Sequence, residues 1–389
     1  MARLLGLDLG SATLKGVVIE SSLRGMQVVG YVEAAVGEGD KATRLADALS
    51  RLVPKLAGTR VDQVAISLPG SAIPTHVVTL PFVDAKRIEA TLPFEVEGQL
   101  PFDLADAAYD YQTSPNSQGQ SNIVVGITRK EELAELLAVL KTHSLEPRIV
   151  THPGLVFQNF LPLIARELNL NDADESFAVV DLGHERTCVA VAHGQNVEFS
   201  RVFPGGGLGL TRALAKEFGI TEPDAQGWKE QHGALGSHAV GPEAQRAAAA
   251  FAKGLSPAVR EIRLSLKAAE ARSQRKIGRV FLTGGTSGLL GIAEFMTEQL
   301  GIPCAMLPIP PEGEPALAGH RNTGAHAYAL AIRANASGAK APRFNLRRGA
   351  FAFKGDLDFV RDRLPQLATF GVLLLLLLII FAMTTRLTH

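Results

Sequence analysis

The sequence is poor in the residues that build covalent or metal-linked frameworks. Its 389 residues include only two cysteines, Cys188 and Cys304, which lie far apart and form no Cys-x-x-Cys pair. This excludes a disulfide framework and a zinc module, and it favours a reducing compartment. The ten histidines show no His-x-x-x-His spacing, which argues against a histidine-built metal site.

The sequence also lacks a net charge. Its 39 lysine and arginine residues balance its 39 aspartate and glutamate residues. No global basic field therefore exists to attract nucleic acid, and we expect no nucleic-acid partner. The composition is 46% hydrophobic and only 20% charged, which excludes disorder as the main state.

One segment has no charge at all and is long enough to cross a membrane. The 20 residues from Gln366 to Thr385 include six consecutive leucines, and at 1.5 Å per residue they span a hydrocarbon core of roughly 30 Å. A buried core helix is the alternative, although such a helix normally carries a polar stripe. Basic residues cluster before this segment and only Arg386 follows it, so the positive-inside rule predicts a cytoplasmic N-terminal part. The sequence thus predicts a transmembrane helix over 366–385, preceded by a juxtamembrane linker over 335–365.

The two halves of the chain repeat one order of predicted elements: strand, turn, strand, turn, strand, helix and strand. The first half has strands at Arg3–Asp8, Leu14–Ser21, Gln27–Ala35 and Gln63–Leu68, with a helix at Ala42–Leu56; the second has strands at Ser176–Asp181, Arg186–Ala192, Val197–Phe203 and Arg279–Leu282, with a helix at Ser256–Arg272. This order predicts an α/β fold of two duplicated lobes, over residues 1–174 and 175–334. We expect an inserted α+β subdomain over about 75–150 and an inserted helical subdomain over about 212–257.

The first turn of each half carries the sequence Asp-Leu-Gly and a set of candidate phosphate ligands. In the first half the candidates are Asp8, Gly10, Ser11, Thr13 and Lys15. A glycine turn after a strand can direct backbone N–H groups at phosphate, and a carboxylate can hold Mg²⁺ through water. Taken alone, such a turn is as well explained by an ordinary hairpin with glycine in its bend.

The second half repeats this turn and adds a glycine-rich loop after its last strand. The candidates in the repeated turn are Asp181, Gly183, His184 and Thr187, and those in the later loop are Gly284, Gly285 and Ser287. Glycine lets backbone approach a ligand closely, and we expect a helix to begin near Ser287 and to present its N-terminus to the ligand. For His184, a turn histidine without a role is the alternative.

These motifs, in this order, resemble those of the actin-like ATPase superfamily. Asp8–Lys15 resembles its first phosphate motif, Asp181–Thr187 its second, and Val280–Leu289 its adenosine motif; the resemblance covers about residues 3–332. It implies bound ATP and Mg²⁺, with Asp8 and Asp181 holding the metal through water. It also implies an FtsA-like inserted subdomain and a second connecting helix at Ala325–Ala329.

Within that superfamily the chain is most similar to the GspL family of type II secretion and to the PilM family of type IV pili. The resemblance is carried by Leu100-Pro101-Phe102, by Phe203–Gly207, and by Phe344–Phe351, which resembles the juxtamembrane Asn-Leu stretch of GspL. PilN proteins carry a related Asn-Leu stretch that docks on PilM. The GspL resemblance implies a single-pass scaffold in the bacterial inner membrane, with an N-terminal domain that is cytoplasmic. Its implied partners are a GspE-like motor ATPase, GspM- and GspF-like membrane proteins, the lipid bilayer and further copies of the chain.

Three other functions stay open at this point. The chain resembles PilM closely enough for a role in the pilus alignment complex. An ATPase or kinase is a second alternative, but no catalytic base or water-orienting residue stands out, so we expect at most weak ATPase activity. A membrane-attached filament former like FtsA is the third; FtsA uses an amphipathic surface helix, whereas this segment is uniformly apolar.

Overall fold

The computed structural model describes residues 1–22, 25–70, 73–115, 119–164, 176–310, 314–336 and 344–354. The chain divides into two compact units, Met1–Leu346 and Arg347–His389. The fold and the candidate site described below belong to the first unit. The predicted membrane segment 366–385 lies outside the described residues. Among the described helices, none is both long and apolar enough to cross a membrane.

The first sheet has five strands in the order β3-β2-β1-β4-β8. Their bounds are β1 Ala2–Leu9, β2 Thr13–Ser22, β3 Gly25–Ala35, β4 Gln63–Ser67 and β8 Ile149–Thr151. The first three strands pair antiparallel, whereas β4 runs parallel to β1 and β8 runs parallel to β4. Leu4 and Leu5 of β1 point to opposite faces of the sheet and are both buried, so the sheet is covered on both faces at this central strand. Helix α1, Lys41–Leu52, follows β3, and its N-cap is Asp40.

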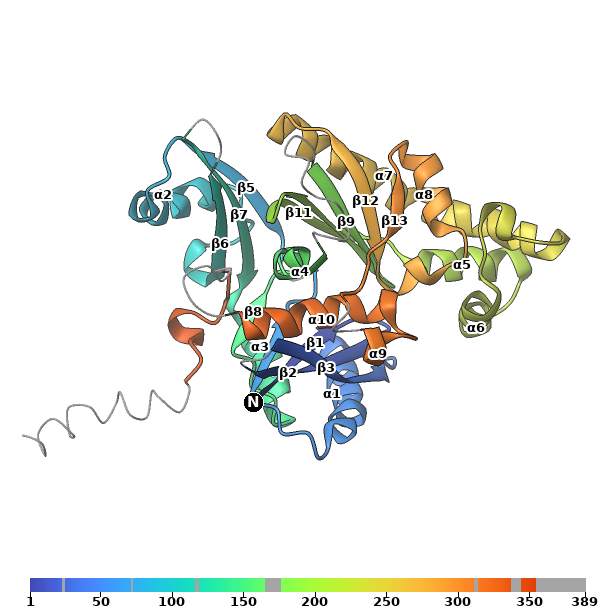
Figure 1. The fold of residues 1–389 in the computed structure, drawn as a ribbon, viewed down its shortest axis with the longest axis horizontal. Coiled ribbons are helices and arrows are strands. Elements are labelled where there is room, and N and C mark those ends of the chain that lie inside the picture. The colour runs from blue at the N-terminus through green and yellow to red at the C-terminus, as the bar shows by residue number, and fades with distance from the viewer. Residues whose placement is uncertain are drawn as a thin grey trace, which may run out of the picture. The chain divides into compact units, whose positions relative to one another are not determined.

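The second sheet repeats this order with later parts of the chain. Its strands are β9 Ser176–Leu182, β10 Arg186–His193, β11 Asn196–Pro204, β12 Ile277–Thr283 and β13 Cys304–Met306. They are arranged as β11-β10-β9-β12-β13, the counterpart of the first sheet strand by strand. The duplication predicted from the sequence is therefore present, with one sheet that includes β1, β2 and β3 and another that includes β9, β11, β12 and β13 (Figure 1). Asp-Leu-Gly lies at the end of the first strand of each sheet and the turn that follows it.

A third sheet is inserted between β4 and β8. It consists of β5 Thr75–Leu80, β6 Ala107–Pro115 and β7 Ser121–Arg129, in the order β5-β7-β6. Helix α2, Ala85–Glu97, places Ile88, Leu92 and Val96 on one face at helical spacing, and these side chains bury against the sheet. Helix α3, Lys130–Thr142, follows β7 directly.

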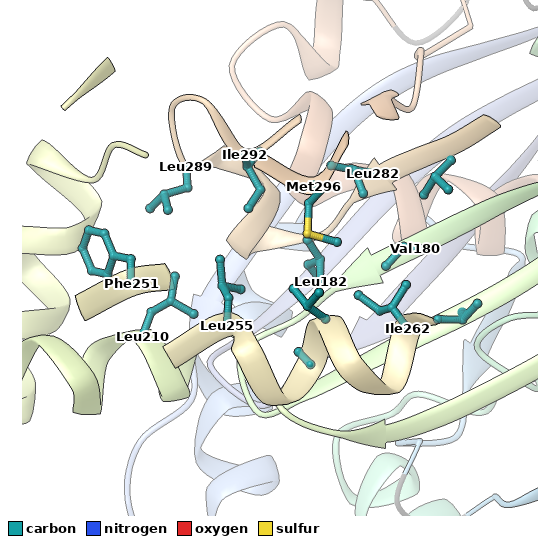
Figure 2. Close-up of a cluster of buried hydrophobic side chains, with 14 of the residues drawn as sticks. Val180, Leu182, Leu210, Phe251, Leu255, Ile262, Leu282, Leu289, Ile292 and Met296 are labelled. Carbon is teal, nitrogen blue, oxygen red and sulfur yellow. The ribbon is translucent and has the colours of Figure 1, made fainter. Parts of the chain in front are cut away.

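The second half carries most of the helices, and one of them corrects the sequence prediction. The helices are α5 Gly207–Phe218, α6 Glu222–His232, α7 Pro242–Ser273 and α8 Ile292–Leu300. We predicted a helix that begins at Ser256, but α7 begins at Pro242 and continues through Pro257. Phe251, Leu255 and Ile262 lie on one buried face that spans the proline, and they belong to a hydrophobic cluster with side chains of α5, of the second sheet and of α8 (Figure 2). This packing stabilises a single helix across the proline.

Helix α10, Arg321–Asn335, packs on strands of both large sheets, on β1, β2 and β4 of the first and on β12 of the second. It also contacts the short helix α4, Phe157–Ile164, while α9, Glu314–Leu317, precedes it. Its alanines allow very close packing: a Cβ atom on Gly6 of β1 would lie only 2.0 Å from the carbonyl oxygen of Ala327. The predicted connecting helix at Ala325–Ala329 is thus present and buried.

Candidate functional site

A cleft of about 780 Å³ lies between the turns of the two large sheets. Its lining includes all the predicted site residues except two: Asp8, Gly10, Ser11, Thr13, Lys15, Asp181, Gly183, His184, Gly284 and Gly285. These residues come from three stretches of the chain that are more than 90 positions apart in sequence. The fold therefore brings the predicted motifs together at one site.

Hairpin 1, the turn between β1 and β2, places a cation opposite a carboxylate. Asp8 and Lys15 are paired across the two strands, and Lys15 Nζ lies 3.5 Å from Asp8 Oδ2. Gly10 is needed for the tightness of the turn, because a Cβ there would lie 2.5 Å from the carbonyl oxygen of Thr13. Both charged groups are largely buried at the cleft wall, where Coulomb interactions are stronger than in bulk water.

Hairpin 2, the turn between β9 and β10, is held by neighbouring loops. The carbonyl oxygen of Gly183 accepts hydrogen bonds from the backbone N–H of Gly207, at 2.9 Å, and from the hydroxyl of Thr286, at 2.7 Å. The start of α5 and the loop after β12 are therefore both tied to this hairpin. Glycine at 206 permits the contact, since a Cβ there would lie 2.4 Å from the same carbonyl oxygen.

The loop after β12 corrects the predicted helix start. Residues Gly285–Gly288 form a 3-10 turn, and α8 begins only at Ile292. No helix N-terminus therefore begins at Ser287. Gly284 instead brings the backbone against hairpin 2: its φ is 89°, and a Cβ on it would lie 2.2 Å from Asp181 Oδ1. Glycine was expected to let the backbone of this loop approach a ligand closely. In the structure the backbone of Gly284 closely approaches the carboxylate of Asp181.

Thr187 and Ser287 are the two predicted ligands that do not line the cleft. Thr187 is fully buried and its hydroxyl donates to the carbonyl oxygen of Gly205 at 2.8 Å. Ser287 is also buried and donates to the carbonyl oxygen of Gly284 at 2.6 Å. Both hydroxyls bond to the backbone of the loops that form the cleft, and neither residue is among its lining. Their role as ligands stays a prediction.

His326 of α10 is a buried group in the cleft that the sequence analysis missed. Its Nδ1 lies 3.2 Å from Asp181 Oδ2, and its Nε2 lies 2.9 Å from the hydroxyl of Ser67, at the end of β4. Burial by itself lowers the pKa of His326, but the hydrogen bond to Asp181 and the charges of Asp8 and Asp181 outweigh it and raise the pKa above its ordinary value. His326 thus links the first sheet to the Asp181 carboxylate of the second.

Lys229 of α6 is a second group that the sequence analysis missed. Its ammonium donates to the carbonyl oxygen of Gly207 at 2.9 Å, to the hydroxyl of Thr211 at 2.8 Å and to Oε1 of Gln226 at 2.7 Å. Burial lowers its pKa from 10.5 to about 8. Burial, followed by the charge of Lys229, also lowers the pKa of the nearby His184. Lys229 lines the cleft, so it contributes positive charge beside the glycine loops.

The donor set of the cleft fits a nucleotide better than a metal ion by itself. Glycine backbone, hydroxyl groups and the cations Lys15 and Lys229 line the cleft, and these are groups that bind phosphate. Among the described residues no cluster of three or more His, Cys, Asp or Glu side chains could hold a metal. The carboxylates of Asp8 and Asp181 fit an Mg²⁺ that keeps its waters and is shared with phosphate oxygens.

A second site lies at the outer edge of the first sheet, where residues 344–346 are docked on β8. We call these residues the docked segment. Phe344 and Leu346 are 1% and 2% exposed, although the segment follows α10 in the chain and joins no sheet. A Cβ on Gly126 of β7 would lie 2.6 Å from Cζ of Phe344. This strand therefore needs glycine at 126 to accept the ring.

Asn345 makes most of the polar contacts of the docked segment. Its Oδ1 accepts from the N–H of Val150 at 3.0 Å, and its Nδ2 donates to the carbonyl oxygen of Arg148 at 3.1 Å. Its own N–H donates to Asp110 Oδ2 at 2.6 Å. The next residue, Leu346, donates its N–H to the carbonyl oxygen of Val150 at 2.9 Å. The amide side chain thus satisfies the free edge of β8, as an added strand would.

The buried Arg333 connects the docked segment with α10. Its Nη2 donates to the carbonyl oxygen of Phe344 at 3.4 Å. Burial lowers the pKa of Arg333, and the negative charge of Asp110 partly opposes this effect. One helix therefore contacts both sites, with His326 at the cleft and Arg333 at the docked segment, two turns further on.

Duplicated five-stranded sheets with a shared cleft and a connecting helix define the class of actin-like ATPase folds. The PilM–PilN type IV pilus biogenesis complex contains a chain with this fold, 24% identical, with a TM-score of 0.72 over 86% of this chain and 99% of that one. The cytoplasmic domain of EpsL, of the Vibrio cholerae type II secretion system, is 13% identical with a TM-score of 0.43, over 90% of this chain and 100% of that one. A likeness that remote carries no argument.

The sequence comparisons define the family within this class. The family model of the type IV pilus assembly protein PilM matches residues 6–312, and the chain belongs to this family. Cell division protein FtsA of Streptococcus pneumoniae serotype 2 (strain D39 / NCTC 7466) is 25% identical over 257 residues, which are 59% of this chain and 55% of that protein. The chain thus spans about half the length of the curated relative that it matches.

Proposed function

We propose that the chain is a nucleotide-binding scaffold of a type IV pilus assembly machine at the bacterial inner membrane. The observation that carries this is the joining of two Asp-Leu-Gly hairpins and a glycine loop around one cleft, in a chain of the PilM family. ATP with Mg²⁺ is the ligand that we assign to the cleft. The hairpin N–H groups and Lys15 would hold the phosphates, and the loop at Gly284 and Gly285 would lie against the adenosine.

The same geometry argues for binding without fast turnover. ATP hydrolysis needs a group that positions or deprotonates a water molecule. The buried candidate, His326, is already bonded at Nδ1 to Asp181 and at Nε2 to Ser67. We therefore expect turnover well below the roughly 1 s⁻¹ at which typical enzymes begin, and a role for the nucleotide in shaping the scaffold.

We further propose that the docked segment supplies in the same chain a contact that PilM makes with a separate protein. The solved structure with the TM-score of 0.72 is a complex of PilM with PilN. PilN carries, by the resemblance described above, an Asn-Leu stretch that docks on PilM. In this chain Asn345 and Leu346 bond to the edge of β8, and the uncharged run 366–385 follows in the sequence. Docking would attach the start of this stretch to the actin-like domain.

A type II secretion scaffold of the GspL kind is the second candidate function. The observation that favours it is the joining of the actin-like domain, the Asn-Leu segment and the uncharged run in one chain. Under this proposal the domain would bind a GspE-like motor ATPase, and GspM- and GspF-like proteins would be its neighbours in the membrane. The identity of the bound motor separates the two proposals.

Nucleotide binding is tested by calorimetric titration of the full chain with ATP and Mg²⁺. We expect one site per chain with a dissociation constant in the micromolar range, roughly −8 kcal/mol. Lys15→Gln removes the phosphate-facing cation and should weaken binding about tenfold or more. Lys216→Gln, on the exposed last turn of α5, removes the same charge outside the cleft and should leave binding unchanged. No heat from the unaltered chain at millimolar ATP would refute the nucleotide proposal.

A further inference from the structure

Arg44 of α1 reaches across the mouth of the cleft between the two hairpins. Its Nη2 donates to the carbonyl oxygen of Ser11, in hairpin 1, at 2.9 Å. The same atom lies 3.6 Å from Oε1 of Glu185, in hairpin 2. The two hairpins also meet directly, because the N–H of Glu185 donates to the hydroxyl of Ser11 at 3.3 Å. Arg44, Ser11 and Glu185 thus link hairpin 1 to hairpin 2 at the wall of the cleft; we call these three residues the clasp.

The clasp leaves part of the guanidinium without a partner. Arg44 Nε is buried, and it has no hydrogen-bond partner within the part of the chain that the structure describes. The ion pair with Glu185 is loose at 3.6 Å and partly exposed to solvent, so it holds the guanidinium only weakly. A guanidinium carries five N–H donors in a planar fork that matches phosphate. An anion with more acceptor oxygens than Glu185 can therefore bind Arg44 more strongly.

We propose that Arg44 binds the terminal phosphate of a nucleoside triphosphate in the cleft and makes the site prefer triphosphates to diphosphates. This inference rests on the proposed nucleotide site. The adenosine loop Gly284–Gly288 belongs to the second sheet, whereas Arg44 and hairpin 1 belong to the first. A nucleotide with its adenosine on that loop directs its outermost phosphate to the first sheet. The outer phosphate of a diphosphate does not reach Arg44, so the ion pair between Arg44 and Glu185 is kept.

Replacement of Glu185 by phosphate as the partner of Arg44 would also change the contact between the two hairpins. When phosphate takes the guanidinium, Glu185 loses its cation and lies beside the negative charge of the ligand. Like charges at short range repel, so hairpin 2 is pushed away from Ser11. The terminal phosphate thus determines whether the clasp is closed on itself or opened around the ligand.

The test is a pair of titrations of the full chain in Mg²⁺, one with the non-hydrolysable triphosphate AMPPNP and one with ADP. Arg44→Gln should weaken AMPPNP binding roughly 10- to 100-fold, the loss of a charge-assisted bidentate contact, and ADP binding less than about threefold. Arg44→Lys keeps the charge but not the fork, and should fall between. Glu185→Gln removes the competing carboxylate and should strengthen AMPPNP binding. Arg51→Gln is the matched control, because Arg51 lies on the same helix and donates to the carbonyl oxygen of Ala35.

The outcomes separate this inference from the function on which it rests. If the unaltered chain binds both nucleotides and Arg44→Gln weakens them equally, or weakens neither, the nucleotide site stands and the role of Arg44 is wrong. If the unaltered chain binds neither nucleotide, the proposed function itself fails and the inference fails with it. Selective loss of AMPPNP binding in Arg44→Gln but not in Arg51→Gln establishes the inference.

Discussion

Release of the docked segment is the perturbation whose size the structure defines best. Asn345→Ala removes the two side-chain hydrogen bonds to Val150 and Arg148. Each such bond contributes about 0.5–1.5 kcal/mol, and the N–H of Val150 left without its partner costs about 1–3 kcal/mol. We therefore expect the segment to detach more readily by about 1–4 kcal/mol, which is about fivefold or more in its opening equilibrium.

Gly126→Ala should release the same segment by changing the surface of β7 on which Phe344 packs, without any change in the segment itself. The new Cβ would lie 2.6 Å from Cζ of Phe344 and 3.1 Å from Cδ1 of Ile73. The first distance is too short for carbon atoms in contact, so the Phe344 ring must move out of its buried position. Gly98→Ala is the matched control, because a Cβ on Gly98 meets no atom within 4 Å.

The assay is amide hydrogen exchange of the full chain, followed at the N–H groups of Asn345 and Leu346. These groups donate to Asp110 and to Val150 respectively, and local opening exposes them to exchange. We expect exchange at least about fivefold faster in Asn345→Ala and Gly126→Ala, and unchanged in Gly98→Ala. If both test variants exchange at the rate of the unaltered chain, the segment does not depend on these contacts and the reasoning is refuted.

Three further predictions concern the cleft and the cysteines. Gly284→Ala should lower the melting temperature by several degrees and abolish nucleotide binding, because the new Cβ would lie 2.2 Å from Asp181 Oδ1. Gly285→Ala should be tolerated, because a Cβ on Gly285 meets no atom within 4 Å. Folding lowers the pKa of Lys229 from 10.5 to about 8. Between these two pH values the unfolded chain binds more protons than the folded chain, so the free energy of unfolding should rise with pH in that window. Urea unfolding at pH 7.5 and 9.5 should show this rise, and Lys229→Met should reduce it. Burial raises the pKa of the Cys304 thiol to about 11, so alkylation at pH 7.5 should be slow until the chain unfolds, and rapid native-state labelling would contradict this.

The cleft was predictable as far as its chemistry depends on local sequence. Asp8 and Asp181 each end a strand before a glycine turn, and strand, turn and carboxylate all lie within a few residues of one another. The duplication showed that the two turns could converge, and the resemblance to actin-like ATPases implied that they bind one nucleotide. The resemblance to the PilM family was confirmed in the same way, because it depends on motifs that are short and continuous.

The groups that were missed act over long sequence separations. Arg44 contacts a residue 33 positions away, and His326 contacts Ser67 over 259 positions. No local pattern marks either residue, because an arginine on a helix face and a histidine among alanines are both usual in structural roles. The docked segment is similar: its motif was recognised, but the partner of the Asn345 N–H, Asp110, lies 235 positions earlier, on β6.

Two predicted helix starts were wrong because tertiary packing overrode the local sequence pattern. The sequence predicted a helix that begins at Ser256, yet α7 begins at Pro242, and its buried face includes Phe251 before Pro257 and Ile262 after it. After β12 the predicted helix start was wrong in the other direction, because the helix begins later than predicted. The glycines after β12 were read as the start of a helix, but Gly284 packs its backbone against Asp181 and Leu182, and the helix begins only after Gly291.

The most direct test of the scaffold proposal is affinity purification of the full chain from detergent-solubilised native membranes, with mass spectrometry of the proteins that accompany it. The account predicts that type IV pilus motor and inner-membrane alignment proteins are recovered with the chain, and that Asn345→Ala lowers their yield. Recovery of a type II secretion motor with its membrane partners would support the second candidate instead. Recovery of neither set, from membranes that contain both, would contradict the claim that this chain is an assembly scaffold.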